Sequence, residues 1–185
     1  MKILITAFEA FDNNDINYSN EILKNITDFD GVTKLILPVE YYNSFKKLKE
    51  NIVNYKPDII ILLGEARSYN AVGFEVIGIN ELSKKPDNAK LVPNKRYIID
   101  GEVDGIFSTL DYDLFKEAFE KANAKHFRSF SAGTYVCNAL LYQTLLYLKQ
   151  NESKIKCGFI HIPKLENDEM DVVIQGINNY IKSLI

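Results

Sequence analysis

The sequence predicts an α/β protein, a three-layer sandwich in which a largely parallel central sheet lies between two layers of helices. Short runs rich in β-branched residues alternate with helical patterns along the whole chain, which is typical of parallel sheets with helical crossovers. The most apolar run, Asp58–Leu63, is continuous instead of alternating, as in a strand buried on both faces. Because no internal repeat or boundary in composition interrupts this order, residues 1–185 are predicted to form a single domain.

The predicted strands are short runs of β-branched and aromatic residues that end near turn-forming residues. In chain order they are Lys2–Thr6, Thr33–Leu37, Asp58–Leu63, Ala71–Asn80, His126–Phe130 and Ile155–Ile162. The fourth is unusual because residues two apart share a face, which aligns Glu75 with Ile77 and Ile79. A carboxylate among isoleucines needs a partner that offsets the cost of burying its charge.

The predicted helices carry apolar residues at spacings of three and four. In chain order they are Ser19–Ile26, Ser44–Val53, Leu114–Ala122, Thr134–Leu148 and Glu169–Leu184. Ser19 is predicted to cap the first helix. Two stretches are expected to be irregular: Ala7–Asn14 is a loop that carries two phenylalanines, and Asn80–Asp104 is a long connection with a short hairpin near Tyr97–Asp100 and Val103.

Charge and composition argue against several classes of function. Twenty-two basic and 25 acidic residues give a net charge of -3 without a basic cluster, so no nucleic-acid partner is expected. No apolar run approaches the length needed to cross a membrane, and the N-terminus lacks the pattern of a signal peptide. Two cysteines without a pairing motif favour a reducing, cytoplasmic location over a disulfide framework.

Cys137 is the first candidate for chemistry. It falls in the first turn of the predicted helix Thr134–Leu148, after a polar entry that contains a glycine. Unpartnered N–H groups and the positive end of the helix dipole favour a thiolate there, and the thiolate is the nucleophilic form. The alternative is a packing role, since free cysteine often behaves as a small buried hydrophobe.

Ligands of open α/β sheets bind beyond the carboxyl ends of the strands, and several candidate residues are predicted at that edge. They are Phe8 and Phe11 after the first strand, Gly64 and Glu65 after the third, and His161 at the end of the last strand. The helix of Cys137 follows a strand and is expected to begin at the same edge. His161 is either a core histidine bonded to the backbone or a base for Cys137, with Glu75 as the carboxylate that orients the base.

The other cysteine and histidine are assigned no chemistry, and no metal or cofactor is expected. Cys157 shares a strand face with His161 but lies roughly 13 Å from it, too far to be its nucleophile. His126 is flanked by Lys125 and Arg128 and is expected at the surface. The cysteines and histidines lack the spacing of a closed zinc site, and no glycine-rich nucleotide-binding loop occurs.

Eight motifs occur in the order in which one known family has them. They are TAFEAF, LPVEY, KPDIIILLGEA, FEVIGIN, PDN, FSTL, SAGTYVCNALLY and GFIHIP. They extend over most of Lys2–Pro163, and SAGTYVCN and GFIHIP are the specific ones. On these motifs the chain resembles the pyroglutamyl peptidase I family, the pyrrolidone-carboxylate peptidases, which are cysteine exopeptidases.

The resemblance implies an α/β fold similar to phosphorylase/hydrolase-like proteins, with Cys137 as nucleophile, His161 as general base and acid, and Glu75 as the third member. It implies that the chain removes N-terminal pyroglutamate from peptides without a cofactor, through a thioester on Cys137. It also implies a homo-oligomer (dimer or tetramer). On this basis Phe8 and Phe11 are expected to wall the lactam ring, and Gly64 and Glu65 to contribute to the substrate site.

The chain departs from the family pattern in loops near the predicted site. Glu65 stands where the family usually has a neutral residue, and the glycine-arginine pair that follows in the family is absent. The family's RIPDN becomes Lys84-Lys85-Pro86-Asp87-Asn88, and a lysine cannot reproduce the bidentate fork of an arginine. Two alternatives therefore stand beside the peptidase: a non-catalytic relative that binds a lactam or a peptide N-terminus, and a cysteine amidase of altered substrate range.

Overall fold

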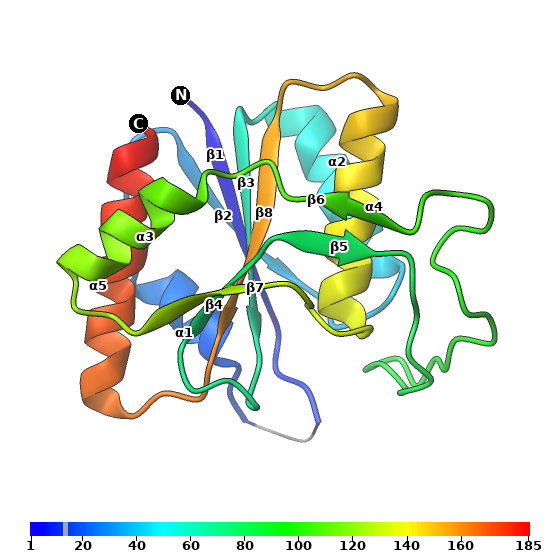
Figure 1. The fold of residues 1–185 in the computed structure, drawn as a ribbon, viewed down its shortest axis with the longest axis horizontal. Helices are drawn as coiled ribbons and strands as arrows, with labels where there is room; N and C mark the ends of the chain where they lie inside the picture. Colours follow the sequence, from blue (N-terminus) through cyan, green and yellow to red (C-terminus); the bar gives the residue numbers. More distant parts are fainter. Residues whose placement is uncertain (13–14) are drawn as a thin grey trace.

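The computed structural model describes residues 1–12 and 15–185, and within them a six-stranded sheet passes between helices that cover both of its faces (Figure 1). Asn13 and Asn14, which end the predicted loop Ala7–Asn14, lie outside the described residues. The strands are β1 (Ile3–Phe8), β2 (Val32–Leu37), β3 (Ile59–Glu65), β4 (Val72–Glu75), β7 (His126–Ser129) and β8 (Lys156–Ile162), in the order β2-β1-β3-β8-β4-β7. The predicted α/β class is confirmed.

Four neighbouring strands of the sheet run in the same direction, and the last two run the opposite way. The pairs β1/β2, β1/β3 and β3/β8 are parallel, whereas β4 is antiparallel to β8 and parallel to β7. The sheet is therefore largely parallel, as predicted, with one reversal between β8 and β4. This reversal lies beside the candidate catalytic residues.

Continuous apolar runs occupy the middle of the sheet because both of its faces are covered. Every residue of β1 and β3 is buried. Alternate residues of these strands enter two separate cores: Ile5 and Ile61 face α1, α3 and α5, while Leu4 and Ile60 face α2 and α4. Burying one such side chain contributes about 1.5–3 kcal/mol, so these runs fix the centre of the fold.

The helices follow the predicted pattern with small shifts at their ends. They are α1 (Tyr18–Asn25), α2 (Asn43–Tyr55), α3 (Tyr112–Lys121), α4 (Val136–Gln150) and α5 (Asn167–Leu184). The predicted cap of α1 is wrong by two residues, because Asn17 accepts a hydrogen bond from the Ser19 N–H while Ser19 lies inside the helix and is buried. No helix among the described residues is both long and apolar enough to span a membrane.

The predicted single strand Ala71–Asn80 is in fact two strands in different sheets. The chain leaves the central sheet at Val76, and β5 (Ile77–Ile79) pairs antiparallel with β6 (Gly105–Phe107). The expected common face of Glu75, Ile77 and Ile79 is therefore wrong. Gly78 explains the departure, because a Cβ there would lie 2.9 Å from the backbone nitrogen of Tyr142 in α4, so only glycine lets β5 pack this closely.

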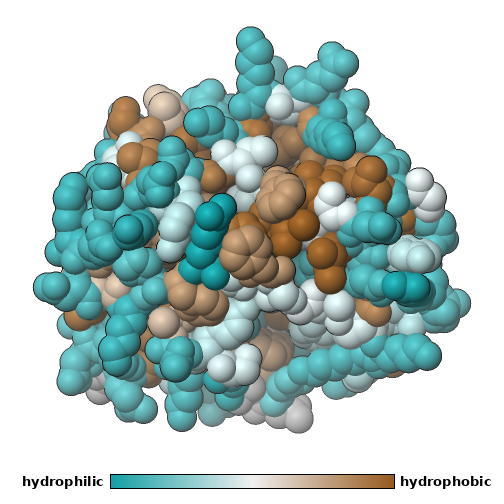
Figure 2. All heavy atoms as spheres, viewed as in Figure 1, coloured by the Kyte–Doolittle hydropathy of each residue, from teal (hydrophilic) through white to brown (hydrophobic). Residues whose placement is uncertain are grey.

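The connection after β5 is irregular as predicted, but it contains no hairpin at Tyr97–Val103. Its strand partner for β5 comes later, in β6. The Asn80 side chain holds the loop instead, accepting from the Ile99 N–H and donating to the Ile99 and Glu102 carbonyls. Apolar side chains gather on the surface over the β5–β6 pair (Figure 2), where Phe107 is 64% exposed.

Candidate active site

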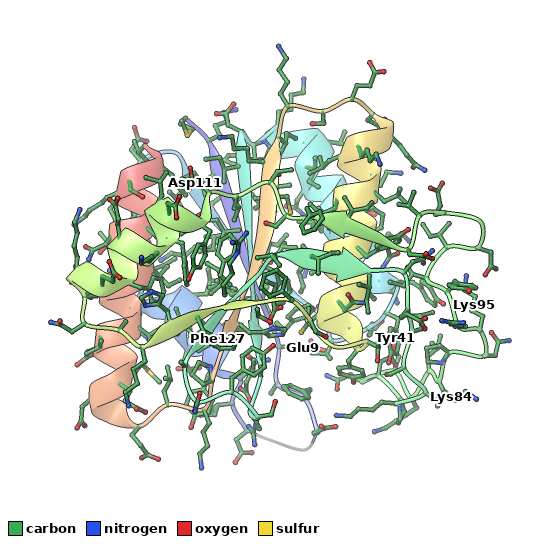
Figure 3. All side chains as sticks on the ribbon, viewed as in Figure 1. Glu9, Tyr41, Lys84, Lys95, Asp111 and Phe127 are labelled. Atoms are coloured by element: carbon green, nitrogen blue, oxygen red, sulfur yellow. The ribbon has the colours of Figure 1, made fainter. Side chains whose placement is uncertain are left out.

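The carboxyl ends of β1, β3 and β8 meet at one edge of the sheet, as the strand directions require. Phe8 ends β1, Gly64 and Glu65 end β3, and His161 is the next-to-last residue of β8. His161 shares its strand face with Cys157 and Phe159, toward α2 and α4. The loops beyond this edge include the labelled residues Glu9 and Tyr41 (Figure 3).

Glu75 and His161 form a buried hydrogen-bonded pair. His161 Nδ1 lies 2.7 Å from Glu75 Oε1, and the two residues are 4% and 0% exposed. Because β4 runs antiparallel to β8, Gly73 stands opposite His161 and Glu75 stands opposite Phe159. The reversal of β4 thus places the Glu75 carboxylate beside the imidazole that the sequence analysis offered as its partner.

The charges of this pair stabilise one another. Burial opposes ionisation of Glu75, but the hydrogen bond and charge of His161 together hold its pKa below the usual value. Burial likewise opposes protonation of His161, but the hydrogen bond and charge of Cys137, followed by those of Glu75, raise its pKa above the ordinary range. The protonated imidazole is therefore stabilised between Cys137 and the Glu75 carboxylate.

Cys137 lies in the first turn of α4, which begins at Val136 without a side-chain cap. It is half-buried and lines the same cavity as His161, close enough to raise the pKa of the imidazole. The expected route to this edge is wrong, since β7 runs opposite to β8 and ends level with Phe159. Residues 130–135 instead carry the chain back to the carboxyl edge before α4 starts.

Gly64 makes room for the cysteine. A Cβ at Gly64 would lie 2.9 Å from Cys137 Sγ and 2.5 Å from Phe159 Cζ, so any larger residue would displace the thiol or the ring. Gly64 lies behind Cys137 and is not among the residues that line the adjacent cavity. Its contribution is therefore space for the thiol, and the predicted substrate contact is not seen in the cavity lining.

A cavity of about 450 Å³ opens beside the thiol and the imidazole. Phe8 and Phe11 line it, as predicted, together with Tyr69, Tyr135 and the segment Ser131–Gly133. Phe8 is buried against Phe159, with ring centroids 6.5 Å apart. The cavity thus has an aromatic wall on the β1 side and reaches Cys137 and His161 at its floor.

Glu65 also lines the cavity, but its carboxylate is already bound. Oε2 accepts a hydrogen bond of 2.6 Å from the Tyr18 N–H at the start of α1, and Oε1 forms an ion pair with Arg67. An acidic side chain at a helix N-terminus is electrostatically favourable. Glu65 therefore anchors α1 to β3, and Arg67 neutralises the charge that distinguishes this loop from the family pattern.

Two residues that line the cavity were not among the candidate site residues, although Lys85 belongs to the segment that replaces the family's RIPDN. Tyr69 contacts both Glu75 and His161, with its hydroxyl 3.0 Å from Glu75 Oε1. Lys85 forms an ion pair of 2.5 Å with Asp12 and lies 4.8 Å from the centre of the Tyr135 ring, at the cavity. Tyr69 follows β3 closely enough that the strand-end rule could have included it, whereas Lys85 comes from the long irregular connection.

The other cysteine and histidine have different surroundings. Cys157 is fully buried, and burial raises the pKa of its thiol. His126 is half-buried, which corrects the expected surface position, and its ring packs against Phe115 and Phe119. Across residues 1–12 and 15–185, no group of three or more histidine, cysteine, aspartate or glutamate side chains is arranged to hold a metal ion.

A thiol beside an imidazole that a carboxylate orients, in an α/β fold, is the arrangement of cysteine hydrolases. The family model described as pyroglutamyl peptidase matches residues 1–183. The chain therefore belongs to the pyroglutamyl peptidase family.

Named relatives and solved structures agree with this assignment. The chain is 37% identical over 175 residues to pyrrolidone-carboxylate peptidase 1 of Caldanaerobacter subterraneus subsp. tengcongensis, covering 92% of this chain and 86% of that protein. It is 36% identical over 176 residues to pyrrolidone-carboxylate peptidase of Brachyspira hyodysenteriae, covering 92% and 87%. The crystal structure of pyroglutamyl peptidase I from Bacillus amyloliquefaciens superposes with a TM-score of 0.90 at 27% identity, covering 97% and 92%.

Proposed function

We propose that this chain is a cysteine exopeptidase that removes N-terminal pyroglutamate from peptides, with Cys137 as nucleophile, His161 as general base and acid, and Glu75 as the residue that orients His161. The observation that carries the proposal is the buried 2.7 Å Glu75–His161 pair beside Cys137 at the floor of an aromatic cavity. Membership of the pyroglutamyl peptidase family supports the substrate class.

The proposed reaction proceeds through a thioester. The Cys137 thiolate attacks the pyroglutamyl carbonyl carbon, and the N–H groups of the uncapped first turn of α4 stabilise the oxyanion. Protonated His161 gives its proton to the leaving amine, and the carbon–nitrogen bond breaks. His161 then takes a proton from water as the water attacks the thioester, which releases pyroglutamic acid and restores the Cys137–His161 pair.

Recognition of the substrate follows from the lack of charge on a pyroglutamyl N-terminus. The lactam ring is flat, with an apolar edge and one amide, so it favours aromatic walls and a few hydrogen-bonding groups. Phe8, Phe11 and Val39 supply the apolar side of the cavity. Glu65, although it lines the same cavity, keeps its carboxylate on Tyr18 and Arg67, so it neither repels an acidic ligand nor selects a basic one as a free charge would.

The pairing of Glu65 and the arrangement of Cys137, His161 and Glu75 bear on the two alternative functions. The amidase of altered range drew its support from Glu65 and from the missing glycine-arginine pair, and the first of these grounds is weakened because the Glu65 charge is buried and paired. Against the non-catalytic relative, Glu75 is hydrogen-bonded to His161, and Cys137 and His161 line one cavity, as a nucleophile and its base would. The peptidase is thus the function best supported by the geometry.

The direct test is hydrolysis of a pyroglutamyl aminomethylcoumarin amide, with prolyl and glutaminyl amides as matched controls. The pyroglutamyl amide is expected to be cleaved at the highest kcat/KM, and a chelator is expected to leave the rate unchanged because no proposed step uses a metal. Tight binding of pyroglutamyl amides without cleavage at any pH contradicts the proposal in favour of a binding protein. Faster cleavage of other N-blocked amides contradicts it in favour of an amidase.

Assembly and location complete the proposal. We infer a homo-oligomer (dimer or tetramer) in the cytoplasm, supported by family resemblance and by two free cysteines. Light scattering after gel filtration tests the first part, and a single monomeric mass across micromolar concentrations contradicts it. Fractionation of the source cells tests the second, and recovery of the protein outside the cytoplasm contradicts it.

A further inference from the structure

Tyr69 joins the Glu75–His161 pair to the loop that leads into α4. Its hydroxyl lies 3.0 Å from Glu75 Oε1, 3.1 Å from Ser129 Oγ and 3.1 Å from the Ser131 carbonyl oxygen. Its ring meets the His161 ring edge-on at 5.6 Å. One side chain therefore touches the carboxylate, the imidazole and the segment Ser131–Gly133 that lines the cavity.

Glycine in β4 creates the space for this side chain. Gly73 stands opposite His161 in the ladder, and a Cβ at Gly73 would lie 2.6 Å from Tyr69 Cε2. On its other side the Tyr69 ring packs against Phe127 of β7, labelled in Figure 3, with centroids 4.9 Å apart. The ring is thus held between β4, β7 and His161, which fixes where its hydroxyl points.

The Tyr69 hydroxyl donates its hydrogen bond to Glu75. Tyr69 has one proton to donate, and both the carboxylate and the Ser131 carbonyl can only accept. A bond to the charged carboxylate is the stronger of the two. Burial, the largest influence, raises the pKa of Tyr69 to about 12, so the proton stays on the phenol throughout the working pH range.

Glu75 depends on this bond for its orientation. Within the described part of the chain its Oε2 is buried without a hydrogen-bond partner, so the bonds from His161 and Tyr69, both on Oε1, hold the carboxylate, and Ser129 also interacts with it. Without the hydroxyl, the carboxylate would keep the bond to His161 and the interaction with Ser129, and would lose the Tyr69 bond that restrains its rotation. The imidazole would then lose the fixed partner that directs it toward Cys137.

We propose that Tyr69 is a positioning residue, whose hydroxyl fixes Glu75 and, through Glu75, aligns His161 with Cys137. The inference rests on the proposed function for the roles of these three residues. Tyr69 belongs to the loop in which this chain lacks the glycine-arginine pair of its family. It acts through another residue and makes no bond to the reacting atoms.

The first test is the variant Tyr69→Phe, which keeps the ring and removes the hydroxyl. We expect kcat on a pyroglutamyl amide to fall about 10-fold with KM within about two-fold of the wild type, because alignment of the base changes while the cavity stays intact. Tyr55→Phe is the matched control, since the Tyr55 hydroxyl donates to the Gly31 carbonyl at 2.6 Å, outside the cavity. An unchanged kcat in Tyr69→Phe overturns the proposal.

A double-mutant cycle separates positioning from general damage to the fold. If Tyr69 acts through Glu75, the Tyr69→Phe change has no further effect on kcat in a Glu75→Ala background. An equal loss in both backgrounds overturns the proposal, because the hydroxyl would then act independently of the carboxylate. Thermal unfolding of the wild type, the two single variants and the double variant identifies any protein that fails to fold. If Glu75→Ala fails to fold, Glu75→Gln takes its place in the cycle.

Alkylation of Cys137 by iodoacetamide provides a readout that needs no peptide substrate. Mass spectrometry of the labelled peptide reports the rate at Cys137 from pH 5 to 10, which spans the ordinary range of a thiol. We expect Tyr69→Phe to slow alkylation several-fold near neutral pH and to leave it unchanged at high pH, where an accessible thiol ionises without help from an imidazole. Identical profiles for Tyr69→Phe and wild type overturn the proposal, even if pyroglutamyl amides turn out not to be substrates.

Discussion

The chain contains two cysteines and two histidines, and the structure divides them between two very different regions. Cys137 and His161 lie at the carboxyl edge of the sheet beside a cavity and the Glu75 carboxylate. Cys157 is fully buried under α4, and His126 packs its ring on Phe115 and Phe119 at the far side of the sheet. Residue type is the same in each pair, so the surroundings alone decide which member can do chemistry.

Cys157 and His161 show the contrast within one strand. Both lie on the same face of β8, separated by Phe159. Between Phe159 and His161 the strand passes from the apolar core to the edge of the sheet, where the start of α4, the Glu75 carboxylate and the cavity lie. Distance from the strand end thus separates a packing residue from a candidate base.

The largest effect on activity is expected when each cysteine is replaced in turn by serine. Cys137→Ser should lower kcat/KM on a pyroglutamyl amide by roughly 10⁴-fold or more, because a hydroxyl is far less ionised than a thiol near neutral pH. Cys157→Ser should keep its activity and instead lose about 1–3 kcal/mol of unfolding free energy, since it buries a hydroxyl in an apolar core. Turnover by Cys137→Ser at the wild-type rate would contradict the assignment of Cys137 as the nucleophile and Cys157 as a packing residue.

The two histidines give the next effect. His161→Ala should lower kcat about 10³-fold through loss of general base and acid catalysis. His126→Ala should keep kcat and lose about 1 kcal/mol of stability, because its ring contacts are with Phe115 and Phe119. Steady-state kinetics with urea unfolding measures both, and a comparable loss of kcat in the two variants would contradict the division between the regions.

Two glycines on neighbouring strands sharpen the comparison at the level of packing. Gly64→Ala pushes a methyl group against Cys137 Sγ and Phe159 Cζ, so it should lower kcat about 10-fold and stability by about 1–3 kcal/mol. Gly158→Ala pushes a methyl group against Ser108 and Leu110 on the other face and should lower stability alone. An active Gly64→Ala protein with normal kcat would show that the thiol does not need this space.

The smallest effect concerns pH. The folded protein raises the pKa of His161, mainly through Cys137 and then Glu75 against the opposing effect of burial. A histidine whose pKa is raised by folding makes its full contribution to the unfolding free energy below its unfolded pKa of about 6.5. This contribution is lost as the pH rises toward and through the pKa of the folded protein. The difference in unfolding free energy between wild type and His161→Ala should therefore shrink above about pH 6.5. Urea unfolding at a series of pH values measures this difference. If it grows above about pH 6.5, folding lowers the pKa of His161, and the prediction is wrong.

Part of the site could be predicted from local sequence, and part could not. The positions of Phe8 and Phe11 at the end of β1 and of His161 at the end of β8 follow from strand patterns, since carboxyl ends of parallel strands share an edge. Helical spacing likewise predicts that Cys137 lies in the first turn of a helix, although it does not predict the route that brings this helix to the edge. Tyr69 follows the end of β3 by only a few residues, but an aromatic residue in a loop is common, and its contacts with Glu75 and His161 arise only on folding. The role of Gly64 likewise depends on which side chains pack above it.

The fold shows the same boundary. Continuous aliphatic runs and helical spacing were enough to predict the α/β class, because buried parallel strands need apolar residues on both faces. The break at Val76 was missed, since the alternating pattern of Ala71–Asn80 continues through it. Only packing of Gly78 on α4 directs β5 out of the central sheet.

The sequence by itself determined the class of fold and the candidate residues Cys137, His161 and Glu75, because residue type and period are local properties. The tertiary structure decided what those residues do together. Reversal of β4 brought Glu75 to His161, residues 130–135 returned Cys137 to the same edge, and Tyr69 fixed the carboxylate from a separate loop. Strand direction and side-chain contacts between distant segments are set by packing of the whole chain, and no local pattern encodes them.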